Sequence, residues 1–161
     1  MVLNIRKYPD PILRKKCEAV KEINEEIKKI AQVMIETEKA SQGVGLAAPQ
    51  VGILKRIIII RFEDGPRAFI NPEILTRSRK KEVIEEGCLS FPGLYLKIKR
   101  PQEIEVKVLD INGQELKFKT KGLIARIFQH EIDHLDGILF IDRVSFWQKI
   151  KLKNKLKKAR D

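Results

Sequence analysis

Residues 122–135 read GLIARIFQHEIDHL, and their pattern is the strongest indication of the architecture. On a helix drawn through these residues, apolar side chains occupy most sides: Leu123, Ile124, Ile127, Phe128, Ile132 and Leu135. A helix that is apolar nearly all round is normally buried, and Gly137 is a typical residue to end it. We therefore predict a helix from about Gly122 to Leu135 at the centre of the protein.

The same helix carries the pattern His130-Glu131-Ile132-Asp133-His134. Two histidines four positions apart share one helix face, so both imidazoles can reach one metal ion. Glu131 is displaced around the helix and can handle a proton beside that metal without binding it. These are the only histidines in the sequence, so the alternative, two hydrogen-bonded core histidines, is the weaker interpretation.

A catalytic metal usually needs a third protein ligand. After His134 the chain contains no further His, Glu or Cys, and Asp136 follows too closely to fold back easily onto the metal. The third ligand is therefore expected upstream, where Cys88 is the best candidate. Three such ligands with an open fourth position would activate a water molecule at neutral pH. The alternative for a free cysteine, a small buried hydrophobic residue, is retained for Cys17.

Working outward, alternating residues and the Asn112-Gly113 turn predict a hairpin of 103–110 with 115–120. Further strands are expected at 56–62, 68–71 and from 83 into 88. An earlier helix should begin after Asn24 as N-cap and run to about Ser41. The predicted fold class is α+β, with mixed or antiparallel strands packed around the central metal-binding helix. One catalytic domain is expected over 1–161, ending in a basic helix over 145–161.

Composition and charge limit the possible environments and partners. Hydrophobic residues make up 43% and charged residues 34% of the 161 residues, as in soluble globular proteins. No apolar run is long enough to span a membrane, and the first residues lack the apolar core of a signal peptide. We therefore expect a cytoplasmic protein with no membrane partner. The net charge of +11 is concentrated near the end, where 149–160 holds seven cations and no acid.

Three segments, in order, resemble the signature motifs of peptide deformylases. They are Gly43-Val44-Gly45-Leu46-Ala47-Ala48-Pro49-Gln50, Glu86-Gly87-Cys88-Leu89-Ser90 and Gln129-His130-Glu131-Ile132-Asp133-His134. The resemblance implies a hydrolase that removes the formyl group from the N-terminal formyl-methionine of newly synthesised polypeptides. It also implies one divalent metal ion, Fe²⁺ in the cell, with Zn²⁺, Ni²⁺ or Co²⁺ possible in preparations.

The resemblance further implies a role for each matching residue. Cys88, His130 and His134 hold the metal, and Glu131 is the general acid and base. The side chain of Gln50 and the backbone N–H of Leu89 stabilise the charge on the formyl oxygen. The peptide lies beside Gly45, and the methionine pocket is lined by Val44, Leu123, Arg126 and Ile127. Arg126 is expected to turn its charged end to solvent, and Arg100 to lie near the peptide entrance or simply on the surface.

Two other classes of function remain as alternatives. The H-E-x-x-H pattern by itself is typical of zinc endopeptidases, although those take their third ligand from further along the chain. The positive charge also fits a module that binds RNA or the ribosome, although only 6% of residues are aromatic and available for stacking on bases. No DNA partner is expected. The basic end could contact ribosomal RNA or merely aid solubility.

Overall fold

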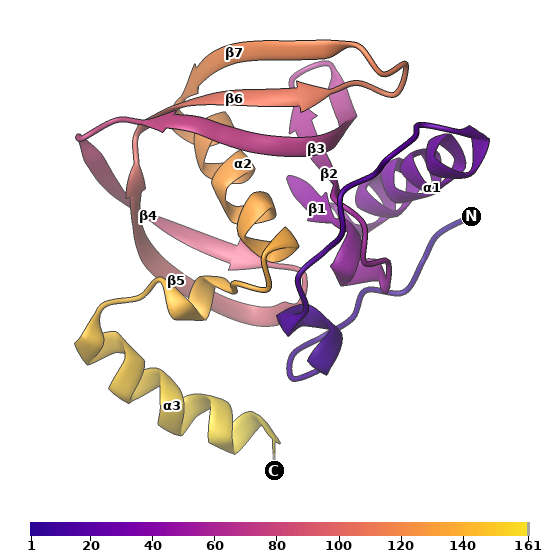
Figure 1. Cartoon of the computed structure of the whole chain (residues 1–161). Coiled ribbons are helices and arrows are strands. Elements are labelled where there is room, and N and C mark those ends of the chain that lie inside the picture. The colour runs from indigo at the N-terminus through magenta and orange to yellow at the C-terminus, as the bar shows by residue number, and fades with distance from the viewer. Residues whose placement is uncertain (161) are drawn as a thin grey trace.

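The computed structural model describes residues 1–160, with side chains for residues 1–157. A central helix, α2 (Gly122–Leu135), lies between a five-stranded sheet and a two-stranded sheet (Figure 1). The larger sheet has the order β1-β2-β3-β6-β7 and the smaller one pairs β4 with β5. Every pairing between these strands is antiparallel. The predicted α+β class with strands around a central helix is therefore confirmed.

The strands of the larger sheet are β1 (Gly45–Ala47), β2 (Ile57–Phe62), β3 (Gly65–Arg77), β6 (Glu103–Leu109) and β7 (Glu115–Lys121). The smaller sheet consists of β4 (Lys81–Cys88) and β5 (Phe91–Pro101). Three short 3-10 helices, η1 (Pro11–Arg14), η2 (Ala48–Val51) and η3 (Phe140–Asp142), connect these elements. The predicted hairpin is confirmed, because β6 and β7 pair antiparallel along their whole length. Its alternating apolar residues pack in the core.

Helix α1 (Glu25–Ser41) forms where the sequence predicts it. The Asn24 side chain accepts a hydrogen bond of 3.0 Å from the Ile27 backbone N–H and so caps the first turn. Ile27, Ala31 and Met34 recur at helical spacing and are buried against the larger sheet. The helix ends at Gln42, whose backbone is left-handed (φ 56°). This end leads directly into the loop before β1.

Helix α2 is central because its apolar residues pack against the larger sheet. Phe128 is fully buried, and its ring centroid lies 5.4 Å from that of Phe69 on β3 and 5.8 Å from that of Phe118 on β7. The C-terminal end of α2 is covered by the N-terminal segment, where the Cys17 N–H donates to the Leu135 carbonyl at 2.8 Å. Cys17 is buried in this core, as the sequence predicts.

The strand predictions were incomplete in three places, the first of which is the short strand β1, where no strand was predicted. Strand β3 is much longer than the predicted 68–71, and its pairing with β6 is interrupted by two register shifts. Strand β5 was not predicted at all, because Pro92 and Gly93 near its start are residues that disfavour strands. Strands β3 and β5 are both defined by their partners rather than by their own sequence pattern.

Helix α3 (Phe146–Arg160) follows α2 and η3 in the chain and projects beyond the sheets (Figure 1). The Ser145 hydroxyl accepts from the Gln148 N–H at 3.3 Å, in agreement with its predicted capping role. Leu152 is buried in the cluster around Phe140, but Phe146 and Trp147 are exposed, at 69% and 74%. These two aromatics therefore do not anchor the helix to the core.

The side chains of Lys158 and Arg160, and the whole of Asp161, lie outside the described residues, although they belong to the predicted basic tail. Within residues 1–160, no helix is both long and apolar enough to cross a membrane.

Gly137 should be required for stability, because the chain after α2 turns back against the N-terminal segment there. A Cβ at Gly137 would collide with the Arg14 carbonyl oxygen, and its φ is +73°. Gly93 is a matched control, with φ +76° and nothing within 4 Å of its added Cβ. We expect Gly93→Ala to cost about 1–2 kcal/mol for the left-handed backbone and Gly137→Ala clearly more, measured by denaturant unfolding. Equal losses would show that the close contact contributes nothing.

Candidate metal centre and active site

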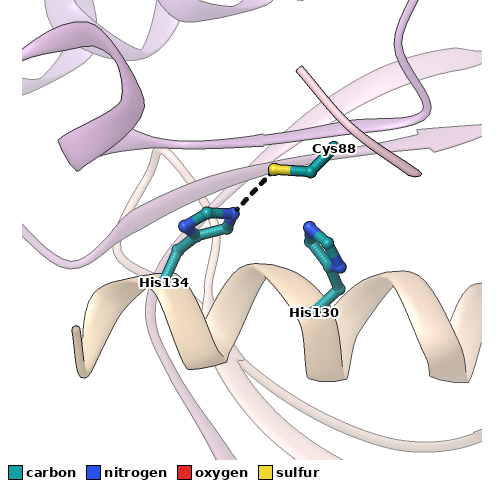
Figure 2. Close-up of side chains that lie close together, drawn as sticks. All are labelled: Cys88, His130 and His134. Atoms are coloured by element: carbon teal, nitrogen blue, oxygen red, sulfur yellow. Dashed lines mark hydrogen bonds between the residues drawn. The ribbon is translucent and has the colours of Figure 1, made fainter. Parts of the chain in front are cut away.

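Three possible metal ligands converge between α2 and the end of β4. Figure 2 shows the side chains of Cys88, His130 and His134 pointing toward one another. One ligand atom from each lies within 4.8 Å of the other two, and Cys88 Sγ is 3.4 Å from His134 Nε2. They form the one group of three or more such residues found within residues 1–160. The structure thus brings together the three residues predicted from sequence.

Local irregularity in the smaller sheet places Cys88 at this point. Strands β4 and β5 pair in regular register up to Gly87 with Tyr95, and the register shifts between Gly87 and Cys88, which pairs with Phe91. Such a shift bends the strand and redirects the side chains that follow it. Cys88 therefore faces α2 from the tight end of the hairpin, opposite the two histidines.

Glu86 fixes the orientation of the His130 ring. Its Oε1 lies 2.9 Å from His130 Nδ1, which leaves Nε2 on the side toward Cys88. Burial alone would raise the pKa of Glu86, but hydrogen bonds from His130 and Arg100 offset this effect and hold the pKa at about 2. Glu86 is therefore a carboxylate at neutral pH, and the arrangement matches the carboxylate–histidine pairs that orient metal ligands.

Arg100 and Arg126 surround Glu86 in the interior. Arg100 contacts both Glu86 oxygens, at 2.6 and 3.0 Å, and Arg126 Nη1 contacts Oε2 at 2.6 Å. Arg126 also donates to the backbone carbonyls of Ile98 and Glu82. Both arginines are about 95% buried. The expectations that Arg100 lies at the peptide entrance and that Arg126 reaches solvent are wrong, because both guanidinium groups neutralise a buried carboxylate.

Asp133 extends this network on the other side of α2. Its Oδ2 accepts from Arg100 at 2.9 Å, and Arg143 adds a bidentate contact at 2.8 and 3.0 Å. Each charged group in this network has an opposite partner, as buried charges require. The network ties α2, β4, β5 and the segment after η3 together behind the metal ligands.

Two groups in the site lack such partners. Glu131 Oε2 and His134 Nδ1 are buried side-chain atoms with no hydrogen-bond partner among the described residues. Burial raises the pKa of Glu131 to about 7. Burial also lowers the pKa of His134 well below its usual value, so its ring is neutral at pH 7. A neutral imidazole is the form that binds metal ions.

Gln50 lies on the other side of Cys88, at the end of η2. Its Oε1 accepts a hydrogen bond from the Ala47 N–H at 2.9 Å. Its Nε2 lies 3.1 Å from the Ser90 hydroxyl and 3.6 Å from Cys88 Sγ. The residue is only 1% exposed. Gln50 is therefore not a surface polar residue, and its amide N–H₂ is directed to the site.

A cavity of about 480 Å³ opens beside these groups. Its lining includes Cys88, His130, Glu131 and Gln50 together with all the predicted substrate-binding residues and Leu89, namely Val44, Gly45, Leu89, Leu123, Arg126 and Ile127. His134 lies behind this surface. Val44 and Leu123 are exposed at 52% and 61%, so they stand at the mouth.

Gly45 allows β1 to pass close to the catalytic helix. A Cβ at this position would lie 2.8 Å from Ile127 Cγ2 and 3.1 Å from Glu131 Oε2. Only glycine leaves space between the strand and Glu131. The backbone of β1 therefore borders the cavity directly, without a side chain in between.

The donor set and its surroundings fit a divalent metal ion. Two imidazoles and a thiolate suit Zn²⁺, Fe²⁺, Ni²⁺ or Co²⁺. The tautomer of His130 is set by Glu86, and His134 is neutral. A bound cation would also lie beside the buried Glu131 carboxyl, whose Oε1 is 4.0 Å from His130 Nε2. The three side chains thus satisfy both the chemistry and the proximity that such a site needs.

The sequence analysis assigned no role to Glu86 or Asp133. A signal for Glu86 was present, because residues two apart on a strand share one face and Glu86 precedes Cys88 by two. For Asp133 no comparable signal existed, since its partners Arg100 and Arg143 are brought to it by the tertiary fold.

Comparison with known proteins agrees with this geometry. The polypeptide deformylase family model matches residues 2–149. The peptide deformylase of Dictyoglomus turgidum is 52% identical over 144 residues, which cover 89% of this chain and 93% of that protein. The crystal structure of peptide deformylase from Thermotoga maritima superposes with a TM-score of 0.88 at 47% identity, covering 90% of this chain and 99% of that one.

The Ehrlichia chaffeensis peptide deformylase in complex with actinonin gives a TM-score of 0.90 at 42% identity, with 98% and 97% of the two chains covered. Similarity of this extent, in sequence and in structure, shows that the chain belongs to the peptide deformylase family.

Proposed function

We propose that this chain hydrolyses the formyl amide bond of N-terminal formyl-methionine on newly synthesised polypeptides and releases formate, in the cytoplasm. The observation that carries the proposal is one cavity bordered by Cys88, His130, a buried glutamate and an apolar wall, with His134 completing the Cys–His–His donor group behind this surface. Cys88, His130 and His134 would hold the metal, with Fe²⁺ as the ion in the cell. When bound, that ion would act as a Lewis acid on a water molecule and on the formyl carbonyl.

Glu131 is the general base and then the general acid. Its unpaired carboxylate oxygen faces the region between β1 and the histidines, where it can accept a proton from the attacking water. It then donates this proton to the methionine nitrogen as the C–N bond breaks. A pKa of about 7 suits both transfers, because the group can be found in either protonation state near neutral pH.

Gln50 and Leu89 stabilise the negative charge that develops on the formyl oxygen. The Gln50 carbonyl group accepts from the Ala47 N–H, which turns its N–H₂ group toward Ser90 and Cys88 at the cavity wall, where one of these two contacts would be exchanged for the formyl oxygen. The Leu89 backbone N–H follows directly after Cys88 at the same wall. Donors that are already oriented by the fold lose little entropy when the charge appears, which is the basis of oxyanion stabilisation.

The cavity accounts for binding of the methionine side chain, and the free edge of β1 accounts for binding of the peptide backbone. The methionine side chain enters between Val44, Leu123 and Ile127, with the alkyl stem of Arg126 in the same wall. Strand β1 is the edge of the larger sheet and pairs only with β2. Its free edge can bind an extended peptide as an added strand, in which backbone hydrogen bonds supply affinity.

A zinc endopeptidase is the less suitable alternative for this site. Such enzymes with the same motif take a third ligand from further along the chain, whereas Cys88 approaches from upstream. Release of formate from formyl-Met-Ala-Ser, together with no cleavage of casein, tests the choice directly.

Loss of any metal ligand should abolish activity. We expect Cys88→Ala, His130→Ala and His134→Ala each to lose bound metal, because two remaining ligands hold a catalytic ion poorly. Metal content is measured by elemental analysis and turnover by formate release. Cys17→Ala is the matched control, since that thiol is buried in the hydrophobic core and should leave metal content unchanged. Full metal occupancy in Cys88→Ala would contradict the assignment.

Glu131→Gln should separate metal binding from catalysis. The variant should retain its metal, because Glu131 is not a ligand, and lose roughly 10²–10⁴-fold in kcat, because the proton carrier is gone. Elemental analysis and single-turnover formate release give the two quantities. A metal-free variant would make Glu131 a ligand, and near-normal turnover would remove it from the mechanism.

Contact with ribosomal RNA is a second candidate function, carried by the cations that spread around most of the surface of α3. Lys151, Lys153, Lys155 and Lys157 are all exposed, and no carboxylate lies among residues 149–160. Such a surface would bind phosphates with a steep dependence on salt. Phe146 and Trp147 at the start of the helix are also exposed, where they could stack on bases.

Neutralising three lysines tests this contact without removing the buried Leu152. We expect Lys151→Gln, Lys153→Gln and Lys155→Gln together to weaken ribosome co-sedimentation at low salt and to leave peptide hydrolysis unchanged. The same three changes at Lys117, Lys119 and Lys121, exposed on β7, remove equal charge elsewhere. If both triple variants lose co-sedimentation equally, total charge rather than α3 is responsible.

A further inference from the structure

One ion pair, between a buried glutamate and a partly exposed arginine, holds the segment that leads into β1. Glu38, in the last turn of α1, is fully buried, and Arg61 on β2 contacts both of its oxygens at 2.8 Å. Arg61 Nε also donates to the Gly43 carbonyl at 3.1 Å, and the Arg61 backbone N–H donates to the Val44 carbonyl at 2.9 Å. A single residue therefore fixes two successive carbonyl groups beside the cavity.

The segment held in this way is short and would otherwise be mobile in solution. It contains two glycines in three residues, and glycine has more backbone freedom to lose than any other residue. Strand β1 adds only three residues of pairing, all on its β2 side. Without the Arg61 guanidinium, the Gly43 carbonyl loses its side-chain donor while the backbone bond at Val44 and the β1–β2 pairing remain. Residues 43–45 would then be less ordered before a peptide binds, and completing their order on binding would reduce affinity.

We propose that Arg61, held in place by Glu38, is a positioning residue that pre-orders residues 43–45 for the extended peptide substrate. The inference rests on the proposed function, because it requires the peptide to bind along β1. Arg61 does not border the cavity, so its effect passes through the Gly43 and Val44 carbonyls. The planar guanidinium is needed because it contacts Glu38 and Gly43 at the same time.

The geometry predicts an effect on peptide binding rather than on the chemical step. The residues assigned to catalysis lie on α2, on η2 and at the end of β4, and none of them contacts Arg61 or Glu38 through a hydrogen bond in the described residues. Loosening residues 43–45 should therefore raise KM for peptides that extend beyond methionine. It should have little effect on kcat, and it should raise KM less for a substrate that ends at methionine, which meets this segment mainly at Val44.

Two variants test the proposal by different routes. Arg61→Lys keeps the charge opposite Glu38 but cannot make the forked contact. Glu38→Met with Arg61→Met removes the pair and leaves no unpaired buried charge, so the fold is expected to survive. Arg67→Lys on β3 is the matched control, because Arg67 pairs with exposed Asp64 and contacts no cavity residue.

Each protein, loaded with metal, is assayed with formyl-Met-Ala-Ser and with formyl-methionine amide. For both Arg61 variants we expect KM for the tripeptide to rise about tenfold, on the scale of one lost hydrogen bond. KM for the amide should rise less than KM for the tripeptide, and metal content should change less than about twofold. In Arg61→Lys, which keeps the Glu38 charge near Glu131, kcat for the tripeptide should also change less than about twofold. Amide hydrogen exchange at residues 43–45 should become faster, and Arg67→Lys should resemble the unmodified protein.

The outcomes separate the inference from the proposed function. An unchanged tripeptide KM in both Arg61 variants would overturn the inference while leaving the deformylase activity intact. Equal losses on the two substrates would also overturn it, because they would indicate a general structural role. Failure of the unmodified, metal-loaded protein to release formate from either substrate would instead contradict the proposed function.

Discussion

The hydrogen bond between His130 Nδ1 and the Glu86 carboxylate joins the two halves of this structure. Glu86 belongs to the smaller sheet and His130 to the central helix, so the contact places Cys88 opposite the histidines. It depends on a charged carboxylate in the interior, which Arg100 and Arg126 make possible. Removing one partner from such a buried network commonly costs about 3–5 kcal/mol. The candidate metal centre and the packing of β4–β5 on α2 therefore depend on the same buried network of charged groups around Glu86.

Polar groups with hydrogen-bond partners lie behind the histidines, whereas a polar atom without such a partner lies at the cavity. Behind the histidines, the carboxylates of Asp133 and Glu86 each have the positively charged Arg100 at hydrogen-bond distance. At the cavity, Glu131 keeps a buried oxygen without a partner, and burial raises its pKa to about 7. A buried group without a partner is costly for stability. Such a cost is typical of groups that function by exchanging a proton or binding a ligand.

The cavity itself is formed between an edge strand and a helix, where a side chain would normally fill the space. Gly45 leaves the β1 backbone adjacent to Ile127 and Glu131. The glycines at 43 and 45 also give this segment a flexible backbone. Its order must therefore come from neighbouring elements. Glu38 on α1 and Arg61 on β2 provide that order from outside the cavity. The site thus depends on residues well beyond the three motifs that identify it.

The sequence by itself determined the central helix, the β6–β7 hairpin and the likeness to the family, because each depends on local periodicity or on residues close together in the chain. The same local spacing predicted that His130 and His134 share a face. Only the tertiary structure decided that Arg100 and Arg126 are buried and that β5 pairs with β4. An isolated arginine in a sequence resembles a surface charge, because its exposure is set by a distant carboxylate. Burial and long-range pairing are properties of several segments at once, and a local pattern carries no information about a partner that folding brings to it.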